Sequence, residues 1–547
     1  MDAVFDAAEL ERDLGDVFRA GAVVPTPKSR RPFWIFFASA AALLIAIVLG
    51  ALLMNDGPRE VGRVVKVEGK CQRLGPGGRA PLAAGEILFA GDGIETNGRG
   101  RVVLRYEDLT TVELAPGTVA TEFGIRGGKT LSLQRGALVG DVTRQSAEQP
   151  MVVRTTEGEA RVLGTKFTLT SSTGSTRLDV EKGKVRLTRR SDGTSADVAA
   201  DQMAVAGAGA APVAKPTTAA VLKMAPGTWL AVPDSAMDAV APDPGKFPAT
   251  RGMMGPAAVV AAWSGGAFDG RRGRLVLWGG GHTDYHGNEL YAFSVDAMAW
   301  QRLTDPTARP RLGREMNDDG TPNGRATYNG LAYLPAPIDR FFSMAGCLAG
   351  GDGGSQAIWM FDFDSRKWAK KSSSGQTPRG GIGATCAVDP AARKVWWGDS
   401  SGIYSYEVDG DRWTRHGDDE LYYFTSAFDP KRGLWIVVGN GKLFAYDVRS
   451  GAPVRQTWKT TGGEGLLAKS NPGLEYDPVR DRIVGWAGGA VYALDPETKA
   501  WTVTDAPGAP PSTPYGIYGR WRYVPTLDAF IVVTASNGNV HFYKPAK

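Results

Sequence analysis

Short apolar runs separated by glycine-rich turns repeat through roughly the last three hundred residues of the chain. Each unit joins an apolar strand, a Gly-rich turn and an aromatic strand, and it ends at a tryptophan. These tryptophans are Trp300, Trp368, Trp413, Trp458 and Trp501. The last three each follow the previous one after about 45 residues, which is the length of a four-stranded propeller blade.

The two ends of this region complement each other. Residues 227–232, around Trp229, have the sequence of a blade-ending strand with no blade before it. Residues 540–543 have the sequence of a third strand with no tryptophan strand after it. We therefore predict that residues 225–547 form a six-bladed propeller, closed by pairing of its two ends, which leaves few free sheet edges.

A different pattern stands near the start of the chain. Residues 33–54 are apolar and uncharged, and about 20 such residues span a bilayer as a helix. The cations Lys28, Arg30 and Arg31 precede this segment. The positive-inside rule places residues 1–32 in the cytoplasm and the rest outside. Because no small-x-small cleavage site follows, we predict an uncleaved, single-pass anchor in the inner membrane of a Gram-negative bacterium, with the bulk of the chain in the periplasm.

The short cytoplasmic tail has an apolar periodicity typical of an amphipathic helix. Residues 2–20 are therefore a candidate docking segment for a cytoplasmic partner. A juxtamembrane helix without a partner explains the same pattern.

The region 61–206 is made of short alternating runs and Gly turns, which predict a β domain. Its strings at 91–96, 162–167 and 180–185 resemble, in order and spacing, the FecR domain. This resemblance implies an all-β periplasmic module that, in the best-known members, relays a signal from an outer-membrane receptor to a cytoplasmic sigma factor. An Ala-, Gly- and Pro-rich linker is predicted at 207–224.

The predicted blades resemble Kelch or galactose-oxidase-like repeats. The strings that carry this resemblance are 275–282 and 288–293, which lead to Trp300. It implies the propeller fold only, because a Tyr–Cys crosslink and paired His ligands for copper cannot be assigned. The predicted fold class is thus all-β: a transmembrane helix, a FecR-type domain and a six-bladed propeller.

Composition narrows the function. The net charge of +5 is small for 547 residues, so no nucleic-acid partner is expected.

Three cysteines exclude a disulfide framework, and Cys347 and Cys386 are either paired or free. Residues 398–402 match Gly-x-Ser-x-Gly, but a strand rather than a helix follows, which favours a hairpin turn. We predict no catalytic residues and no cofactor.

Loops between strands 2 and 3 share a face with the links from strand 4 to the next blade. Two polar segments, 281–288 and 304–328, fall in these classes, and long loops are often functional. We predict that they meet at one mouth of the ring as a ligand-binding surface. The candidate residues are His282, Asp284, Tyr285, His286, Asn288, Arg314, Arg325 and Tyr328.

A metal is an alternative for part of this set. His282, His286 and Asp284 provide only three ligands, and a hydrogen bond from His282 to Asp284 that braces the Gly-rich loop explains the same residues. We predict no metal.

The sequence therefore favours a membrane-anchored binding or scaffold protein whose propeller recognises an envelope protein or glycan. The alternatives are a FecR-like transmembrane signal transducer or anti-sigma regulator, and a carbohydrate-active enzyme.

Overall fold

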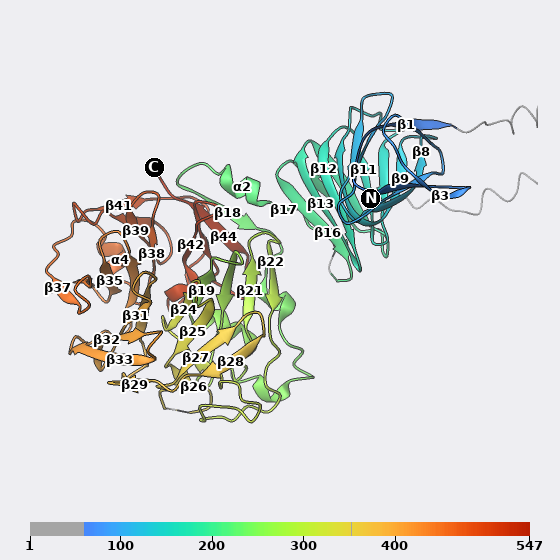
Figure 1. Ribbon diagram of the computed structural model, residues 1–547. Helices are drawn as coiled ribbons and strands as arrows, with labels where there is room; N and C mark the ends of the chain where they lie inside the picture. The colour runs from blue at the N-terminus through green and yellow to red at the C-terminus, as the bar shows by residue number, and fades with distance from the viewer. Residues whose placement is uncertain (1–58, 210, 352) are drawn as a thin grey trace, which may run out of the picture. The chain divides into compact units, whose positions relative to one another are not determined.

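The computed structural model describes residues 59–209, 211–351 and 353–547, and it is built almost entirely of β-strands (Figure 1). The predicted tail, 1–32, and membrane segment, 33–54, lie outside the described residues. None of the helices within the described ranges has the length and apolarity needed to cross a bilayer. The helices are short: α2 (Thr218–Leu222), α3 (Ala258–Ala261), α4 (Glu464–Leu467) and four 3-10 turns at Met237–Val240, Pro248–Thr250, Gly255–Ala257 and Tyr518–Arg520.

The first β domain contains seventeen strands. They are β1 (Glu60–Glu68), β2 (Cys71–Gly75), β3 (Gly78–Pro81), β4 (Ile87–Phe89), β5 (Gly93–Thr96), β6 (Arg101–Arg105), β7 (Thr111–Leu114), β8 (Val119–Gly124), β9 (Thr130–Asp141), β10 (Met151–Arg154), β11 (Gly158–Val162), β12 (Lys166–Ser172), β13 (Ser175–Lys182), β14 (Lys184–Arg189), β15 (Ser195–Ala199), β16 (Gln202–Gly207) and β17 (Lys215–Pro216). Strands β6, β12 and β13 bury every second residue in a shared core, as a two-layer β domain requires.

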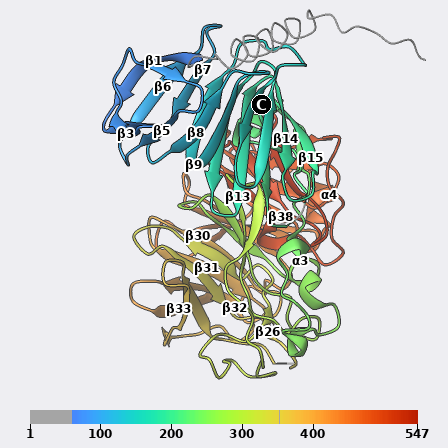
Figure 2. The same cartoon turned by 90° about the vertical axis from the view of Figure 1, so that its right-hand side faces the viewer.

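Strand β9 joins the two sheets of this domain (Figure 2). One sheet runs β4–β1–β6–β7–β9–β12–β13–β16–β17, and the other runs β3–β2–β5–β8–β9–β10–β11–β14–β15. The strand changes sheets at Gly136, whose φ is 91°. A Cβ there would lie 2.4 Å from Thr118 Oγ1, so the bend requires glycine.

The C-terminal region is a six-bladed propeller. Its blades, from inner to outer strand, are β19 (Gly266–Asp269), β20 (Arg274–Leu277), β21 (Tyr291–Ser294) and β22 (Ala299–Arg302); β24 (Leu331–Leu334), β25 (Arg340–Met344), β27 (Ile358–Asp362) and β28 (Lys367–Lys370); β30 (Thr385–Asp389), β31 (Lys394–Asp399), β32 (Gly402–Glu407) and β33 (Arg412–Gly417), with β29 (Ser374–Gly375) at the edge; β34 (Thr425–Asp429), β35 (Leu434–Gly439), β36 (Lys442–Asp447) and β37 (Val454–Gln456); β38 (Gly473–Asp477), β39 (Arg482–Trp486), β40 (Val491–Leu494) and β41 (Trp501–Thr504); and β42 (Arg522–Val524), β43 (Ala529–Val532), β44 (Val540–Lys544) and β18 (Thr228–Val232). A two-stranded ribbon, β23 (Arg325–Ala326) with β26 (Cys347–Leu348), lies outside the blades.

The predicted closure of the ring is confirmed. Strand β18 pairs antiparallel with β44, and Trp229 stands opposite Tyr543 with ring centroids 5.0 Å apart. The indole of Trp229 also packs on Trp486 and Trp521 at 5.3 and 5.8 Å. The last blade is thus completed by a strand from the start of the propeller, which removes two free edges.

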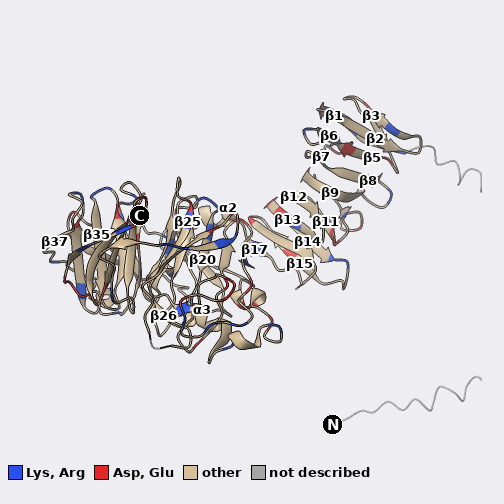
Figure 3. Ribbon diagram, turned by 60° about the horizontal axis from the view of Figure 1, so that its bottom comes forward, with Lys and Arg blue, Asp and Glu red and all other residues tan. Residues whose placement is uncertain are grey.

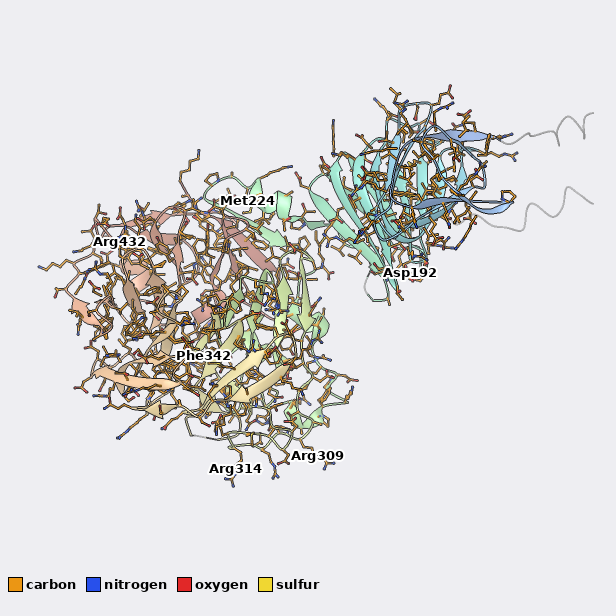
Figure 4. The ribbon with its side chains drawn as sticks, viewed as in Figure 1. Asp192, Met224, Arg309, Arg314, Phe342 and Arg432 are labelled. Carbon is orange, nitrogen blue, oxygen red and sulfur yellow. The ribbon has the colours of Figure 1, made fainter. Side chains whose placement is uncertain are left out.

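A repeated ion pair joins neighbouring blades. In Asp429-x-x-Arg432, the arginine bonds the buried Asp429 at 2.8 Å and holds Asp481 of the next blade with two hydrogen bonds of 2.7 Å. Arg432 is labelled in Figure 4. Tyr476 also donates to Asp481, at 2.9 Å. The same arrangement recurs in Asp269–Arg272–Asp339–Tyr333 and in Asp477–Arg480–Asp528–Tyr523. We call these three clusters the blade latches.

Three smaller predictions can be compared with the structure. The Gly-x-Ser-x-Gly segment is a hairpin turn, because Asp399 and Gly402 pair across it. Trp458 lies just beyond β37 instead of inside a fourth strand. The predicted linker, 207–224, contains β17, which pairs with β16, and helix α2, so it has more regular structure than its composition indicates.

Candidate ligand-binding face of the propeller

The two segments predicted to meet do contact each other. Asn288, which follows the Gly-rich loop, donates from Nδ2 to Thr321 Oγ1 at 2.8 Å and to the Pro322 carbonyl at 2.9 Å. Its Oδ1 accepts the Thr307 amide at 2.8 Å. Asn288 is buried, and these bonds use its amide to fasten the long link to the first blade.

Arg325 lies under this surface. Its guanidinium is fully buried, forms a 2.8 Å ion pair with Glu315 and a 2.7 Å bond to Ser355, and sits 5.5 Å over the Trp278 ring. Burial lowers the pKa of Arg325 and opposes ionisation of Glu315, but the arginine charge and hydrogen bonds from neighbours leave the pKa of Glu315 below its ordinary value. Arg325 therefore anchors the link from inside and has no exposed surface for a ligand.

Tyr285 is buried as well. Its hydroxyl and that of Tyr291 both donate to Glu289 Oε1 at 2.6 Å. Burial raises the pKa of Glu289 although both hydrogen bonds act in the opposite direction. These three side chains form an internal polar cluster in the first blade.

His282, Asp284 and His286 are half-buried. Burial raises the pKa of Asp284, and the nearby His282 partly opposes this shift. Burial lowers the pKa of His286, while its hydrogen bond to Ala249 opposes the shift. Among the described residues, no group of three or more His, Cys, Asp or Glu side chains is placed to hold a metal ion.

Arg314 is exposed and, with Arg309, projects outward from the propeller (Figure 4). Exposed apolar side chains lie in the long link and in the segment before α3. Met253 is 80% exposed and its amide bonds the Thr283 carbonyl at 3.0 Å, while Met316 lies in the long link and is 50% exposed. This rim thus combines exposed arginine, carboxylate and apolar side chains.

Tyr328 lies over the propeller axis, where it meets two further tyrosines. Its ring is 5.7 Å from that of Tyr423 and 6.2 Å from that of Tyr518, and both contacts are edge-on. The three residues precede the inner strands of blades two, four and six, and all have left-handed φ values between 49° and 58°. They therefore close the mouth of the ring together, and we call them the tyrosine triad.

The triad is flanked by more exposed aromatic rings. Tyr422, 44% exposed, packs against Tyr423 with ring centroids 4.3 Å apart, and Tyr515, 40% exposed, packs against Trp263 at 4.2 Å; both ring pairs are tilted. Burial raises the pKa of Tyr423 to about 12, so its hydroxyl stays protonated and can donate. The mouth thus presents an uncharged aromatic surface beside the rim that carries Arg309 and Arg314.

Below the triad, the inner strands carry polar side chains. Asn329 donates to Thr385 Oγ1, which donates to Ser426 Oγ, each at 2.9 Å. Arg522 bonds Glu475 at 2.8 Å and the Gly266 carbonyl at 2.9 Å. These bonds link the inner strands directly and fix the platform on which the triad rests.

Sequence reasoning found Tyr328 but missed its two partners. The available signal was an aromatic residue two to four positions before an inner strand, which recurs at Trp263, Tyr328, Tyr423 and Tyr518. The convergence of alternate blades on the axis needs the closed ring and has no local pattern.

Comparison with known proteins bears on the first β domain. Residues 92–186, from β5 into β14, match the family model for FecR protein. This segment is a FecR domain. The predicted FecR resemblance and the six-bladed propeller are therefore both confirmed, whereas the Kelch or galactose-oxidase type stays a prediction.

Solved structures give a weaker likeness. Two crystal structures of a candidate anti-sigma factor from Parabacteroides distasonis, at 1.65 and 2.50 Å resolution, are 17% identical to the chain and have TM-scores of 0.21. Each alignment covers 27% of this chain, and 70% and 69% of the respective other chain. The comparison with curated proteins gives no match.

Proposed function

We propose that this protein is a FecR-type signal transducer of the cell envelope, in which the propeller is the ligand-binding module. The FecR match at residues 92–186 is the observation that carries this proposal. In the best-known members, such a domain relays an extracytoplasmic signal to a cytoplasmic regulator. Residues 33–54 would supply the inner-membrane anchor, and residues 2–20 the contact with a cytoplasmic partner.

The propeller supports the binding half of the proposal. A closed ring with blade latches is rigid, and its mouth combines exposed aromatic rings, held from below by the largely buried tyrosine triad, with the rim that includes Arg309 and Arg314. Concave or flat surfaces of this kind, held on a rigid scaffold, suit recognition of an envelope protein or glycan. His282, Asp284 and His286 would contact the ligand from the edge of this mouth.

Deletion of residues 2–20 tests the signalling half. We expect the deletion to change the transcription of a defined gene set while the membrane-bound chain keeps its normal amount and its protease-resistant outer domains. A second strain, lacking residues 225–547, should lose the response to the external cue but keep membrane attachment. Unchanged transcripts in both strains would contradict signalling.

A binding or scaffold role without signalling is the second candidate. The exposed Met253 and Met316, on the rim that also carries Arg309 and Arg314, favour it, because exposed apolar side chains rimmed by polar residues are typical of protein interfaces. Alanine substitution of His282, Asp284 and Arg314 together should then abolish ligand binding and leave transcription unaffected.

A further inference from the structure

The outer face of one FecR-domain sheet carries cations in an arrangement that lowers stability. Arg161 of β11 is paired directly across from Arg186 of β14, and like charges in such cross-strand positions repel each other. The side chains are 57% and 58% exposed. Glu159 and Asp197 bond Arg161 and Arg186 at 2.9 and 2.7 Å, but each carboxylate lies to one side, not between the guanidinium groups.

Two further cations lie beside this pair with no carboxylate bound to them. Lys184 is two residues before Arg186 on β14 and therefore faces the same side of the sheet. Arg144 belongs to the segment that follows β9, which is held against the sheet by bonds from the Gln145 amide to the Leu163 carbonyl and from the Val142 amide to the Thr165 carbonyl. Within the described residues, neither Lys184 nor Arg144 forms an ion pair.

These residues line a groove that encloses about 640 Å³. Arg144, Arg161, Lys184 and Arg186 line it together with a single carboxylate, Asp197. The apolar part of the wall includes Leu163, which is 46% exposed. Figure 3 shows β11, β14 and β15, the strands that form its floor, side by side.

We propose that this groove binds an extended acidic peptide segment of a partner protein. Lys184 and Arg186 are separated by about 7 Å along their strand, which matches the spacing of alternate side chains on an extended peptide. Carboxylates at alternate positions would meet these two cations, and an intervening apolar residue would contact Leu163. The charge of the groove makes the partner acidic, and the length of the cationic row favours a chain over a single anion.

The inference goes beyond the proposed function, because the groove binds its peptide whether or not a signal crosses the membrane. It also places a second recognition surface on the chain, on the FecR domain and distinct from the mouth of the propeller. The partner is identified by acidic residues at alternate positions with apolar residues between them.

The test uses the detergent-solubilised full chain and a fluorescein-labelled peptide of sequence Glu-Leu-Glu-Leu-Glu. Fluorescence anisotropy should show saturable binding that weakens with salt, whereas the Gln-Leu-Gln-Leu-Gln peptide should not bind. The double variant Arg144→Glu, Lys184→Glu should weaken binding about tenfold or more, since each surface pair lost becomes a repulsion. The milder Arg144→Gln, Lys184→Gln variant should weaken it about threefold.

The matched control is Lys70→Glu, Arg126→Glu, which makes the same change in net charge at two exposed turns of the same domain, away from the groove. It should bind the acidic peptide like the unmodified chain. Equal weakening by the control, or no binding of the acidic peptide, would overturn the proposal. If tripolyphosphate displaced the labelled peptide at the same concentration as unlabelled peptide does, the ligand of the groove would be a phosphate and not an acidic peptide, which would also overturn the proposal.

Discussion

The blade latches should contribute strongly to the stability of the propeller, and Arg432→Met tests this. The substitution keeps most of the aliphatic stem and removes the guanidinium. Asp429 and Asp481 then lose their arginine partner. Asp429 is fully buried, and the Asp481 side chain is 23% exposed. Removing one member of a buried ion pair costs about 3–5 kcal/mol. Because Asp481 keeps some solvent, its bond from Tyr476 and its ion pair with Lys431, we expect a loss near the lower end, about 3 kcal/mol.

Urea unfolding followed by tryptophan fluorescence measures this loss. Every tryptophan except Trp34 lies at or after Trp229, so the signal reports on the propeller and not on the FecR domain. With a denaturant slope of about 3 kcal/mol per molar urea, the midpoint should fall by about 1 M. Arg432→Lys should give an intermediate loss, because an ammonium group keeps the charge but not the two parallel hydrogen bonds.

Arg449→Met is the control. Arg449 pairs with Asp447 inside the same blade, but its side chain is 70% exposed and solvent screens the pair, so the urea midpoint should stay close to that of the unmodified chain. If Arg432→Met destabilised the propeller no more than Arg449→Met, the latches would not be what holds blades four and five together.

Three more outcomes follow from the same contacts. Trp229→Ala should lower the free energy of unfolding by about 3 kcal/mol, measured as a lower urea midpoint. An unchanged midpoint would show that the closing strand does not stabilise the propeller. Hydrogen bonding from Arg480 lowers the pKa of Asp528 to about 2, and Arg432 likewise lowers the pKa of Asp481. Because both pKa values lie below the unfolded value of about 3.9, the stabilisation from these carboxylates is complete above about pH 4 and is lost as the pH falls toward 2. Urea midpoints should therefore drop between about pH 4 and pH 2, and they should drop less in Arg480→Met. Burial raises the pKa of Cys386 to about 12, so a thiol reagent at pH 8 should leave it unmodified until urea unfolds the chain, and rapid labelling of the native protein would contradict its burial.

Periodic features of the architecture were predictable from sequence. The tryptophan spacing predicted the blades. The strands around Trp229 and Tyr543 each lacked a neighbour in the sequence, which predicted that they pair with each other and close the ring. The FecR domain was predicted from the resemblance of the strings at 91–96, 162–167 and 180–185 to that family, and the family match at residues 92–186 confirms it. The two cysteines left open by sequence, Cys347 and Cys386, are both buried but lie in separate core clusters, so they do not form a disulfide with each other.

The site was harder to predict, because polarity in a loop does not show which way a side chain points. Arg325 and Asn288 look like ligand contacts in the sequence, yet burial and hydrogen bonding make them supports of the loop. The Asp-x-x-Arg pattern of Asp429 and Arg432 was visible, but its partner Asp481 lies about fifty residues away and is brought near only by the ring.

Closure and latching also explain how a site at the mouth can be kept in place. The tyrosine triad has one member from each of blades two, four and six, so any change in the angle between blades would separate the rings. Each residue of the triad has a left-handed φ, which costs about 1 kcal/mol or more for a non-glycine residue and persists only where the surroundings hold it. The hydrogen bond from the Tyr328 amide to the Trp263 carbonyl, at 2.7 Å, and that from Tyr423 to Gly383, at 2.9 Å, tie these strained residues to the neighbouring blade. A ring opened at Trp229 would therefore lose the shape of its mouth before it lost its blades, and ligand binding should be more sensitive to closure than the strand content is.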